Sequence, residues 1–385
     1  LSIGPARTPG NGIFSGMHEV LPGHYQIFSR EGMEQVCYWD LTAAPHTDSY
    51  EKTVEMVSYL VRDAVKRQMV SDVPVCTFLS GGIDSSIVTA LAARHMQKEG
   101  KILNTFSFDF SENEKYFKSN AFQPERDLPY VNRMLQYCKT SHTYLECSQE
   151  ALFAALSDAV TAKDLPGMTD VDASLLYFCS EVAKHNKVTL TGECADEIFG
   201  GYPWFYRPEL MNRDGFPWSA DPAARTSILS DDVLRTLDLA EYSHARYEET
   251  LSHVPHLDGE SPEEARRRDI GYLNIKWFMQ TLLDRMDRTS VSGIFWMRCA
   301  CRCSDCSKGD QGLSGAFPCA DNLCHPWNDD RFFLCNRDGT DYAGNSTADA
   351  AAGKLSCDCL SGGRCAGTGD AVGKGKAEWL ISLPL

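Results

Sequence analysis

The chain has 385 residues, a formal net charge of −16 and 43% hydrophobic residues. This length and apolar content suffice for two domains or one large α/β domain. The negative charge disfavours a surface built for the nucleic-acid backbone. The sequence contains no run of 18 apolar residues and no signal-like amino end. We therefore expect a cytoplasmic enzyme that acts on small-molecule substrates, with no nucleic-acid or membrane partner.

Residues 1–45 predict the remnant of an antiparallel domain and a linker. Strand-like segments at residues 24–28 and 35–39 are separated by the turn-forming residues Arg30, Glu31 and Gly32. Two strands cannot bury a core by themselves, and the chain begins with Leu1 rather than methionine. We expect the main body of this amino-terminal domain to be missing.

Strands and helices alternate over residues 46–290. A helix at residues 49–68 precedes the strand at residues 75–79 and the helix that ends near Gly100. Further strands are expected at residues 102–110, 142–145 and 188–190, and further helices at residues 127–138, 149–162, 172–186, 242–253 and 262–288. This alternation predicts an α/β fold with a doubly wound parallel sheet and flanking helices, and with ligands at the carboxyl ends of its strands.

The string SGGIDSS, residues 80–86, connects the first of these strands to its helix. Two glycines permit a tight turn in which backbone N–H groups, a helix amino end and the hydroxyls of Ser80, Ser85 and Ser86 converge on a phosphate or pyrophosphate. Asp84 would repel phosphate oxygens unless a cation lay between them, so it predicts Mg²⁺. The structural alternative is an ordinary glycine-rich turn with an aspartate at the helix amino end.

In a second motif, KVTLTGECADEIFGGY at residues 187–202, the strand expected at residues 188–190 is followed by Glu193, Asp196 and Glu197. Because the carboxyl ends of parallel strands share one edge, we expect Asp196 to face Asp84 and to share Mg²⁺ on the pyrophosphate. Glu193 would contact the reacting acyl group or the attacking amine. Alternatively, Asp196 and Glu197 only stabilise a helix amino end.

SGGIDSS, followed about 110 residues later by TGECADEIFGGY, resembles the synthetase domain of glutamine-dependent asparagine synthetases, in the ATP pyrophosphatase superfamily. The strings LPGMTDVDASLLYFC, GHYQIF and CYWDL are also similar to that family. The resemblance spans roughly residues 12–290 and implies an adenine nucleotide alpha hydrolase-like fold after a glutaminase-domain remnant. Cys194 stands where the family usually has glycine.

The resemblance implies an ATP- and Mg²⁺-dependent ligase. Aspartate would be activated to β-aspartyl-AMP with release of pyrophosphate, and ammonia would then give asparagine. In the family the ammonia comes from glutamine, hydrolysed in an amino-terminal domain that this chain largely lacks. The residues implied in ATP or pyrophosphate binding are Phe78, Ser80, Gly81, Gly82, Asp84, Ser85, Ser86, Phe108, Thr191 and Gly192.

The resemblance gives further residues roles of their own. Asp84 and Asp196 would bind Mg²⁺, and Glu193 would serve adenylate formation. The acceptor side of the site would include Asp170, Asp172 and Ser174, and the basic residues Arg285 and Arg288 would bind phosphate or serve helix packing.

Residues 291–385 depart from the family. Ten of the 16 cysteines lie between Cys299 and Cys365, and residues 292–385 contain one valine and no sustained periodicity. We expect a tail that is disordered or translated out of frame. A zinc site is the alternative, with ligands from Cys299, Cys301, Cys303 and Cys306, followed by Cys319, Cys324 and His325. The spacing of the first four does not match paired C-x2-C knuckles.

Two other functions stay open at this point. One is another ATP pyrophosphatase-type enzyme, such as a β-lactam synthetase-like or argininosuccinate synthetase-like protein; the strings LPGMTDVDASLLYF and GECADEIFGGY favour asparagine synthetase over it. The other is an inactive nucleotide-binding fragment. The sequence does not set the oligomeric state, for which a homodimer is one hypothesis.

Overall fold

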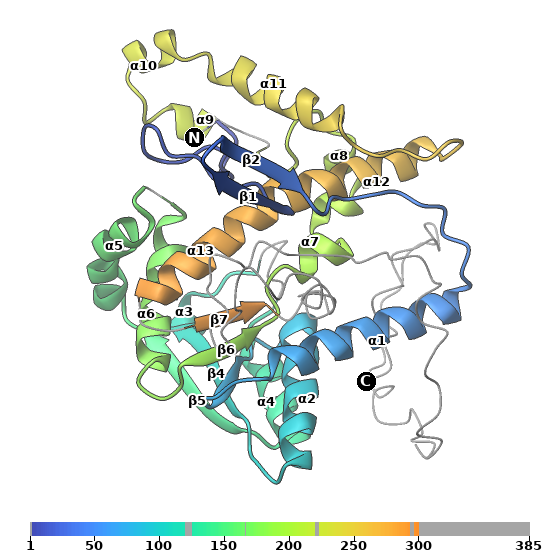
Figure 1. The fold of residues 1–385 in the computed structure, drawn as a ribbon. Helices are drawn as coiled ribbons and strands as arrows, with labels where there is room; N and C mark the ends of the chain where they lie inside the picture. Colours follow the sequence, from blue (N-terminus) through green and yellow to red (C-terminus); the bar gives the residue numbers. More distant parts are fainter. Residues whose placement is uncertain (1, 120–124, 166, 220–222, 293–295, 300–385) are drawn as a thin grey trace, which may run out of the picture.

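The computed structural model describes residues 2–119, 125–165, 167–219, 223–292 and 296–299. In these ranges five parallel strands form one sheet in the order β5-β4-β3-β6-β7 (Figure 1). The chain moves outward from β3 to β5 and then returns to β6, so the sheet is doubly wound, as the alternation predicted. Its strands are β3 (Val75–Phe78), β4 (Asn104–Phe110), β5 (Ser141–Cys147), β6 (Val188–Thr191) and β7 (Trp296–Cys299).

Helices cover both faces of this sheet (Figure 1). Successive side chains of a strand point to opposite faces, so Val75 packs with α1 (Tyr50–Gln68), α2 (Ile83–Lys98) and α4 (Leu128–Cys138). Its neighbour Cys76 packs against Cys179 and Val182 of α6 (Thr169–Val182), which α5 (Gln149–Lys163) covers in turn. The core is thus two apolar layers, one on each face.

The predicted helix at residues 262–288 is three elements in the structure. α12 (Pro262–Leu273) continues into a π-helical segment, η2 (Asn274–Phe278), and then into α13 (Met279–Ser292). The buried side chain of Asn274 donates from Nδ2 to the carbonyl of Ile270 at 2.8 Å. The wider turn allows Trp277 and Phe278 to enter two different apolar clusters.

The α/β domain also extends beyond the boundary predicted at residue 290. α13 ends at Ser292, and β7 pairs in parallel with β6 from Val188 beside Trp296 to Thr191 beside Cys299. A four-residue strand is too short to show periodicity, and it forms because its backbone completes the open edge of β6. The other residues of the predicted tail, including the alternative zinc ligands Cys301, Cys303 and Cys306, lie outside the described residues.

The two strands predicted near the amino end form an antiparallel hairpin, β1 (His24–Ser29) and β2 (Gly32–Cys37). The residues before it pack against the later helices: Ile3 is 3% exposed and lies in a cluster with Tyr247 of α11 (Leu239–Leu251) and Leu273 of α12. The side chain of Trp218 donates to the carbonyl of Ile3 at 3.0 Å. The assignment of residues 1–45 to a glutaminase domain stays a prediction.

Short helical turns make up the remaining described elements: α3 (Asn113–Tyr116), α7 (Ala195–Phe199), η1 (Pro203–Phe205), α8 (Pro208–Met211), α9 (Ala223–Thr226) and α10 (Asp231–Thr236). None of the helices in the described ranges combines the length and the hydropathy that crossing a bilayer requires.

Candidate active site

The SGGIDSS string forms the turn between β3 and α2. Gly82 is the N-cap of the 16-residue helix α2 and has no side chain that could accept hydrogen bonds from the first turn. The first N–H groups of α2, at the positive end of the helix dipole, are therefore left for a ligand or solvent. The loop is stabilised from within, because Ser85 Oγ accepts from Ser80 N at 3.2 Å and donates to the carbonyl of Gly82 at 3.2 Å. Of the predicted hydroxyl donors, Ser85 is therefore buried in the loop, while Ser80 is exposed and Ser86 half-buried.

Gly81 is the position in this loop that requires glycine. Its φ is +83°, and a Cβ added there would lie 2.7 Å from Tyr130 Cβ and 2.9 Å from Val131 N. The loop therefore rests directly on the first turn of α4, which sets its conformation.

The second motif lies against the first. A Cβ added to Gly192 would lie 2.8 Å from both Asp84 Cβ and Ser85 N, so the turn after β6 touches the first turn of α2. Thr191 is buried at the end of β6, where its Oγ1 accepts from Glu193 N at 3.4 Å. The two predicted loops thus meet at the switch point of the sheet, between β3 and β6, where doubly wound folds bind ligands.

Asp84 and Asp196 are brought together at this point. Burial raises the pKa of Asp84 to about 6, and the negative charge of Asp196 adds to the increase. Burial also raises the pKa of Asp196. A Cβ on Gly201 would lie 1.8 Å from Asp196 Oδ1, so the glycine provides the space that this carboxylate occupies.

Two partly desolvated carboxylates that repel each other fit a shared divalent cation. In the described part of the chain, no three histidine, cysteine or acidic side chains are placed to hold a metal ion together. Mg²⁺ is commonly held by one or two carboxylates together with substrate phosphates. The donor set around Asp84 and Asp196 therefore fits Mg²⁺ that enters with a nucleotide.

Glu193, which follows β6, pairs with Arg285. The resemblance had left open whether Arg285 binds phosphate or serves helix packing. The Oε1 atom of Glu193 lies 2.8 Å from Nη2 of Arg285 on α13. The Arg285 side chain is 12% exposed, and its Nε is buried with no hydrogen-bond partner among the described residues. Arg285 thus orients Glu193, whereas Arg288 pairs with Asp284 at 2.8 Å and with Asp164 at 3.2 Å in helix packing.

Glu197 is the third acidic residue of the second motif, and its environment could not be read from the sequence. It is 2% exposed, and its Oε1 accepts from the hydroxyl of Tyr202 at 2.6 Å. Burial raises its pKa to about 7, and the charges of Glu193 and Asp196 add to the increase. All three acids therefore lie close together, but the Glu197 carboxylate is enclosed by protein and stabilises the turn after α7.

Phe78 and Phe108, which the resemblance implies in ATP binding, lie near the carboxyl ends of β3 and β4. Their rings pack edge to face at 4.7 Å, and Phe108 also stacks on Phe178 of α6 at 4.2 Å. Both side chains therefore belong to the layer under α6. Backbone contact with a nucleoside, as the resemblance implies, stays a prediction.

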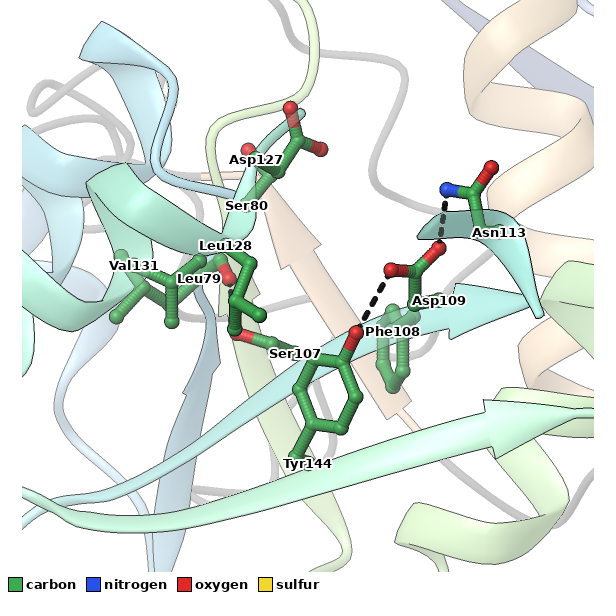
Figure 2. Close-up of a pocket in the computed structure, with 10 residues that line it drawn as sticks. All are labelled: Leu79, Ser80, Ser107, Phe108, Asp109, Asn113, Asp127, Leu128, Val131 and Tyr144. Carbon is green, nitrogen blue, oxygen red and sulfur yellow. Dashed lines mark hydrogen bonds between the residues drawn. The ribbon is translucent and has the colours of Figure 1, made fainter. Parts of the chain in front are cut away.

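A pocket opens beside these strand ends, and its lining includes Phe108 and Ser80 (Figure 2). It begins at Ser80 of the loop and is bounded by the end of β4, the first turn of α4 and Tyr144 of β5. Sequence reasoning missed the polar residues Asp109, Asn113 and Tyr144, because only the sheet order brings them together.

The predicted acceptor-side residues belong to α6, and Met168, just before this helix, lies with its Sδ 3.7 Å from Nη1 of Arg285, so their role stays a prediction. Asp172 is 2% exposed and pairs with buried Lys163 at 3.2 Å, and its Oδ2 accepts from Met168 N at 2.7 Å. Ser174 is buried and donates to the carbonyl of Val171 at 3.1 Å, while Asp170 is exposed. The contacts of Asp172 and Ser174 are structural contacts within and between α5 and α6.

This arrangement defines the class of the protein: a doubly wound α/β domain whose glycine-rich loop and acidic loop meet at the switch point, suited to a phosphate-bearing ligand with a divalent cation. The family model described as asparagine synthase matches residues 56–294. The chain belongs to the asparagine synthase family.

Individual relatives agree with this assignment. Asparagine synthetase [glutamine-hydrolyzing] 3 of Bacillus subtilis is 51% identical over 297 residues, which cover 77% of this chain and 48% of the relative. Amidase chyE of Penicillium rubens is 32% identical over 223 residues, covering 56% of this chain and 33% of that protein. The chain thus spans about half the length of the Bacillus relative.

Among solved structures, the NAD+ synthetase of Burkholderia pseudomallei is similar over 58% of this chain and 85% of its own, with 16% identity and a TM-score of 0.25. A TM-score this low carries no argument about fold or function.

Proposed function

We propose that this chain carries the synthetase activity of an asparagine synthetase: activation of aspartate by ATP to β-aspartyl-AMP with release of pyrophosphate, followed by amination with ammonia. The observation that carries the proposal is the direct contact of the two motifs, in which Gly192 lies against Asp84 and Ser85. This contact brings the glycine-rich loop, two acidic residues and the Glu193–Arg285 pair to one edge of the sheet in an asparagine synthase family member, which supports the proposal.

The chemistry explains why these groups are needed. A carboxylate is a poor acyl donor because oxide is a poor leaving group, so joining it to AMP supplies a better one. The Ser80–Ser86 loop and the amino end of α2 would bind the pyrophosphate as negative charge moves onto it. Mg²⁺, held by Asp84 and Asp196, would supply neutralising charge to the phosphates. Glu193 would orient the acyl group and then the amine, with its own position set by Arg285.

Ammonia is the amine in this proposal, with glutamine as its source where a glutaminase domain is present. The Bacillus relative carries glutamine hydrolysis in its name, but less than half of its length is matched here. Cytoplasmic location and a homodimer remain parts of the proposal that need their own measurements.

The test is release of pyrophosphate from ATP, Mg²⁺ and aspartate with ammonium chloride as the amine source. We expect release that requires aspartate and that falls at least about a hundredfold in Asp84→Asn, which removes one negative charge and keeps the side-chain shape. The matched control is Asp63→Asn, an aspartate that pairs with Arg67 on the surface of α1.

Two results would contradict the proposal. One is binding of ATP by the wild-type chain without aspartate-dependent release, which is the behaviour of an inactive nucleotide-binding fragment. The other is release that does not depend on Asp84.

A further inference from the structure

The pocket beside the SGGIDSS loop is not built for phosphate. No lysine or arginine occurs among the ten described residues that line it, whereas two aspartates, Asp109 and Asp127, do. Its apolar lining comes from Leu79, Phe108, Leu128 and Val131. Because Ser80 belongs to both the pocket and the loop, a nucleotide whose phosphates bind the loop would place its nucleoside part here.

Asp109, at the end of β4, is the centre of the polar side of this pocket (Figure 2). Its Oδ1 accepts from Phe110 N at 2.9 Å and from Asn113 Nδ2 at 2.6 Å. Its Oδ2 accepts from the hydroxyl of Tyr144 at 2.7 Å and lies 3.6 Å from Nη2 of Arg126. Three hydrogen-bond donors and the nearby guanidinium of Arg126 therefore fix this carboxylate.

The fixed carboxylate decides which way the Asn113 amide points. An ionised aspartate can only accept hydrogen bonds, so the group of Asn113 that meets it must be the NH₂. The amide oxygen then points away from Asp109, as Figure 2 shows. The chain can turn back in this way because Glu112, between the two residues, has a left-handed backbone with φ of 63°.

Tyr144 keeps this arrangement in place. Burial and the hydrogen bond to Asp109 raise the pKa of Tyr144, so its hydroxyl stays protonated and continues to donate. Tyr144 comes from β5 and Asn113 from the turn after β4, so the neighbouring strands hold the amide at the pocket.

We propose that Asn113, oriented by Asp109 and Tyr144, reads the purine base and makes the site selective for adenine over guanine. Because one N–H of the Asn113 amide goes to Asp109, its second N–H and its oxygen remain for a ligand, and this donor and acceptor match the N7 acceptor and N6 amino donor of adenine. Guanine presents two acceptors, N7 and O6, so its O6 would face the amide oxygen. The inference rests on the proposed function, because it takes ATP as the nucleotide, and it names the residue that selects the base.

The experiment measures the dissociation constants of ATP and GTP with Mg²⁺ by calorimetry, without turnover, on the full chain. We expect the wild type to bind ATP about ten- to a hundredfold more tightly than GTP, as a bidentate base contact provides. Asn113→Ala should reduce this ratio to near unity and leave the affinity for inorganic pyrophosphate unchanged. Asp109→Asn should reduce the ratio as well, because an amide in place of the carboxylate no longer dictates the orientation of Asn113.

The control is Glu112→Gln, which changes the neighbouring exposed residue that pairs with Lys115 and does not line the pocket. It should keep the wild-type ratio. Asn113→Leu is a second variant at the same position should Asn113→Ala fold poorly, since it keeps the side-chain size and removes both the donor and the acceptor.

The outcomes separate the inference from the proposed function. An unchanged ratio in an Asn113 variant that still binds pyrophosphate overturns the inference, even if asparagine is made. A wild-type chain that binds ATP selectively but shows no aspartate-dependent release overturns only the proposed reaction. A wild-type chain that binds neither ATP nor pyrophosphate overturns both.

Discussion

The carboxylate of Glu193 and the guanidinium of Arg285 lie 2.8 Å apart and join the turn after β6 to α13. Both side chains are largely buried, with exposed fractions of 26% for Glu193 and 12% for Arg285. Such a pair costs free energy to desolvate, and removing one partner leaves the other charge uncompensated. Pairing with Arg285 therefore holds the Glu193 carboxylate in one orientation, next to the acyl group of the proposed reaction.

We predict that Arg285→Ala lowers kcat for aspartate-dependent pyrophosphate release about 10- to 100-fold, the value of a hydrogen bond between charged groups. The dissociation constant for ATP should stay near the wild-type value, because Arg285 lies beside Glu193 and not in the SGGIDSS loop. Arg285→Lys should restore part of kcat. The control is Arg267→Ala, which breaks a more exposed pair with Glu263 on α12. Equal losses in Arg285→Ala and Arg267→Ala would contradict the role.

Gly192 is predicted to tolerate no side chain. In Gly192→Ala the new Cβ would lie 2.8 Å from Asp84 Cβ and Ser85 N, closer than real contacts allow. The turn after β6 and the first turn of α2 must then separate, so we expect ATP binding to weaken at least about tenfold. Calorimetry measures the affinity.

Gly271→Ala provides the matched comparison, since nothing lies within 4 Å of a Cβ there. Gly271 is inside α12, where alanine is favoured by about 1 kcal/mol over glycine. This variant should bind ATP normally and be at least as stable as wild type. Normal ATP binding by Gly192→Ala would show that the two motifs need not touch.

Cys194, the residue that departs from the family pattern, has a left-handed backbone with φ of 71° and is 2% exposed. Its side chain packs near Met279 and Met286 of α13. Cys194→Gly and Cys194→Ala both lose the sulfur, but only glycine adopts this backbone without strain. We therefore predict that Cys194→Gly is more stable than Cys194→Ala by about 1 kcal/mol in urea unfolding. The reverse order would mean that this turn relaxes out of the left-handed region.

His142 gives a prediction about pH. Its Nδ1 lies 2.9 Å from Thr105 Oγ1, its Nε2 is buried with no hydrogen-bond partner among the described residues, and burial lowers its pKa. The unfolded chain therefore takes up a proton before the folded chain does as the pH falls below about 6.5. The stability that neutral His142 provides is present above that pH and is lost below it.

The measurement is the free energy of unfolding in urea at pH 7.5 and pH 5.5. We expect the decrease between these two values to be smaller in His142→Gln than in wild type, because glutamine does not titrate. A decrease of the same size in both proteins would show that other groups account for the pH dependence.

Much of the fold could be predicted because its signals are local. The apolar run of β3 followed by SGGIDSS specifies a buried strand, a tight turn and a helix within a few residues. The regular alternation of such units then implies parallel strands whose carboxyl ends share an edge. For this reason the contact of the two motifs, and with it the proximity of Asp84 and Asp196, followed from the sequence.

Other features depend on partners far away in the chain. β7 exists because the edge of β6 is open to it, and the π-helical break at Asn274 follows from what its neighbours pack against. The pairing of Arg285 with Glu193 and the position of Asn113 against Asp109 and Tyr144 are settled by sheet order and helix packing. The sequence by itself determined the loops and their chemistry, since glycines and charged groups act locally. Only the tertiary structure decided which buried group each charge meets, because electrostatic and packing energies depend on distance in space.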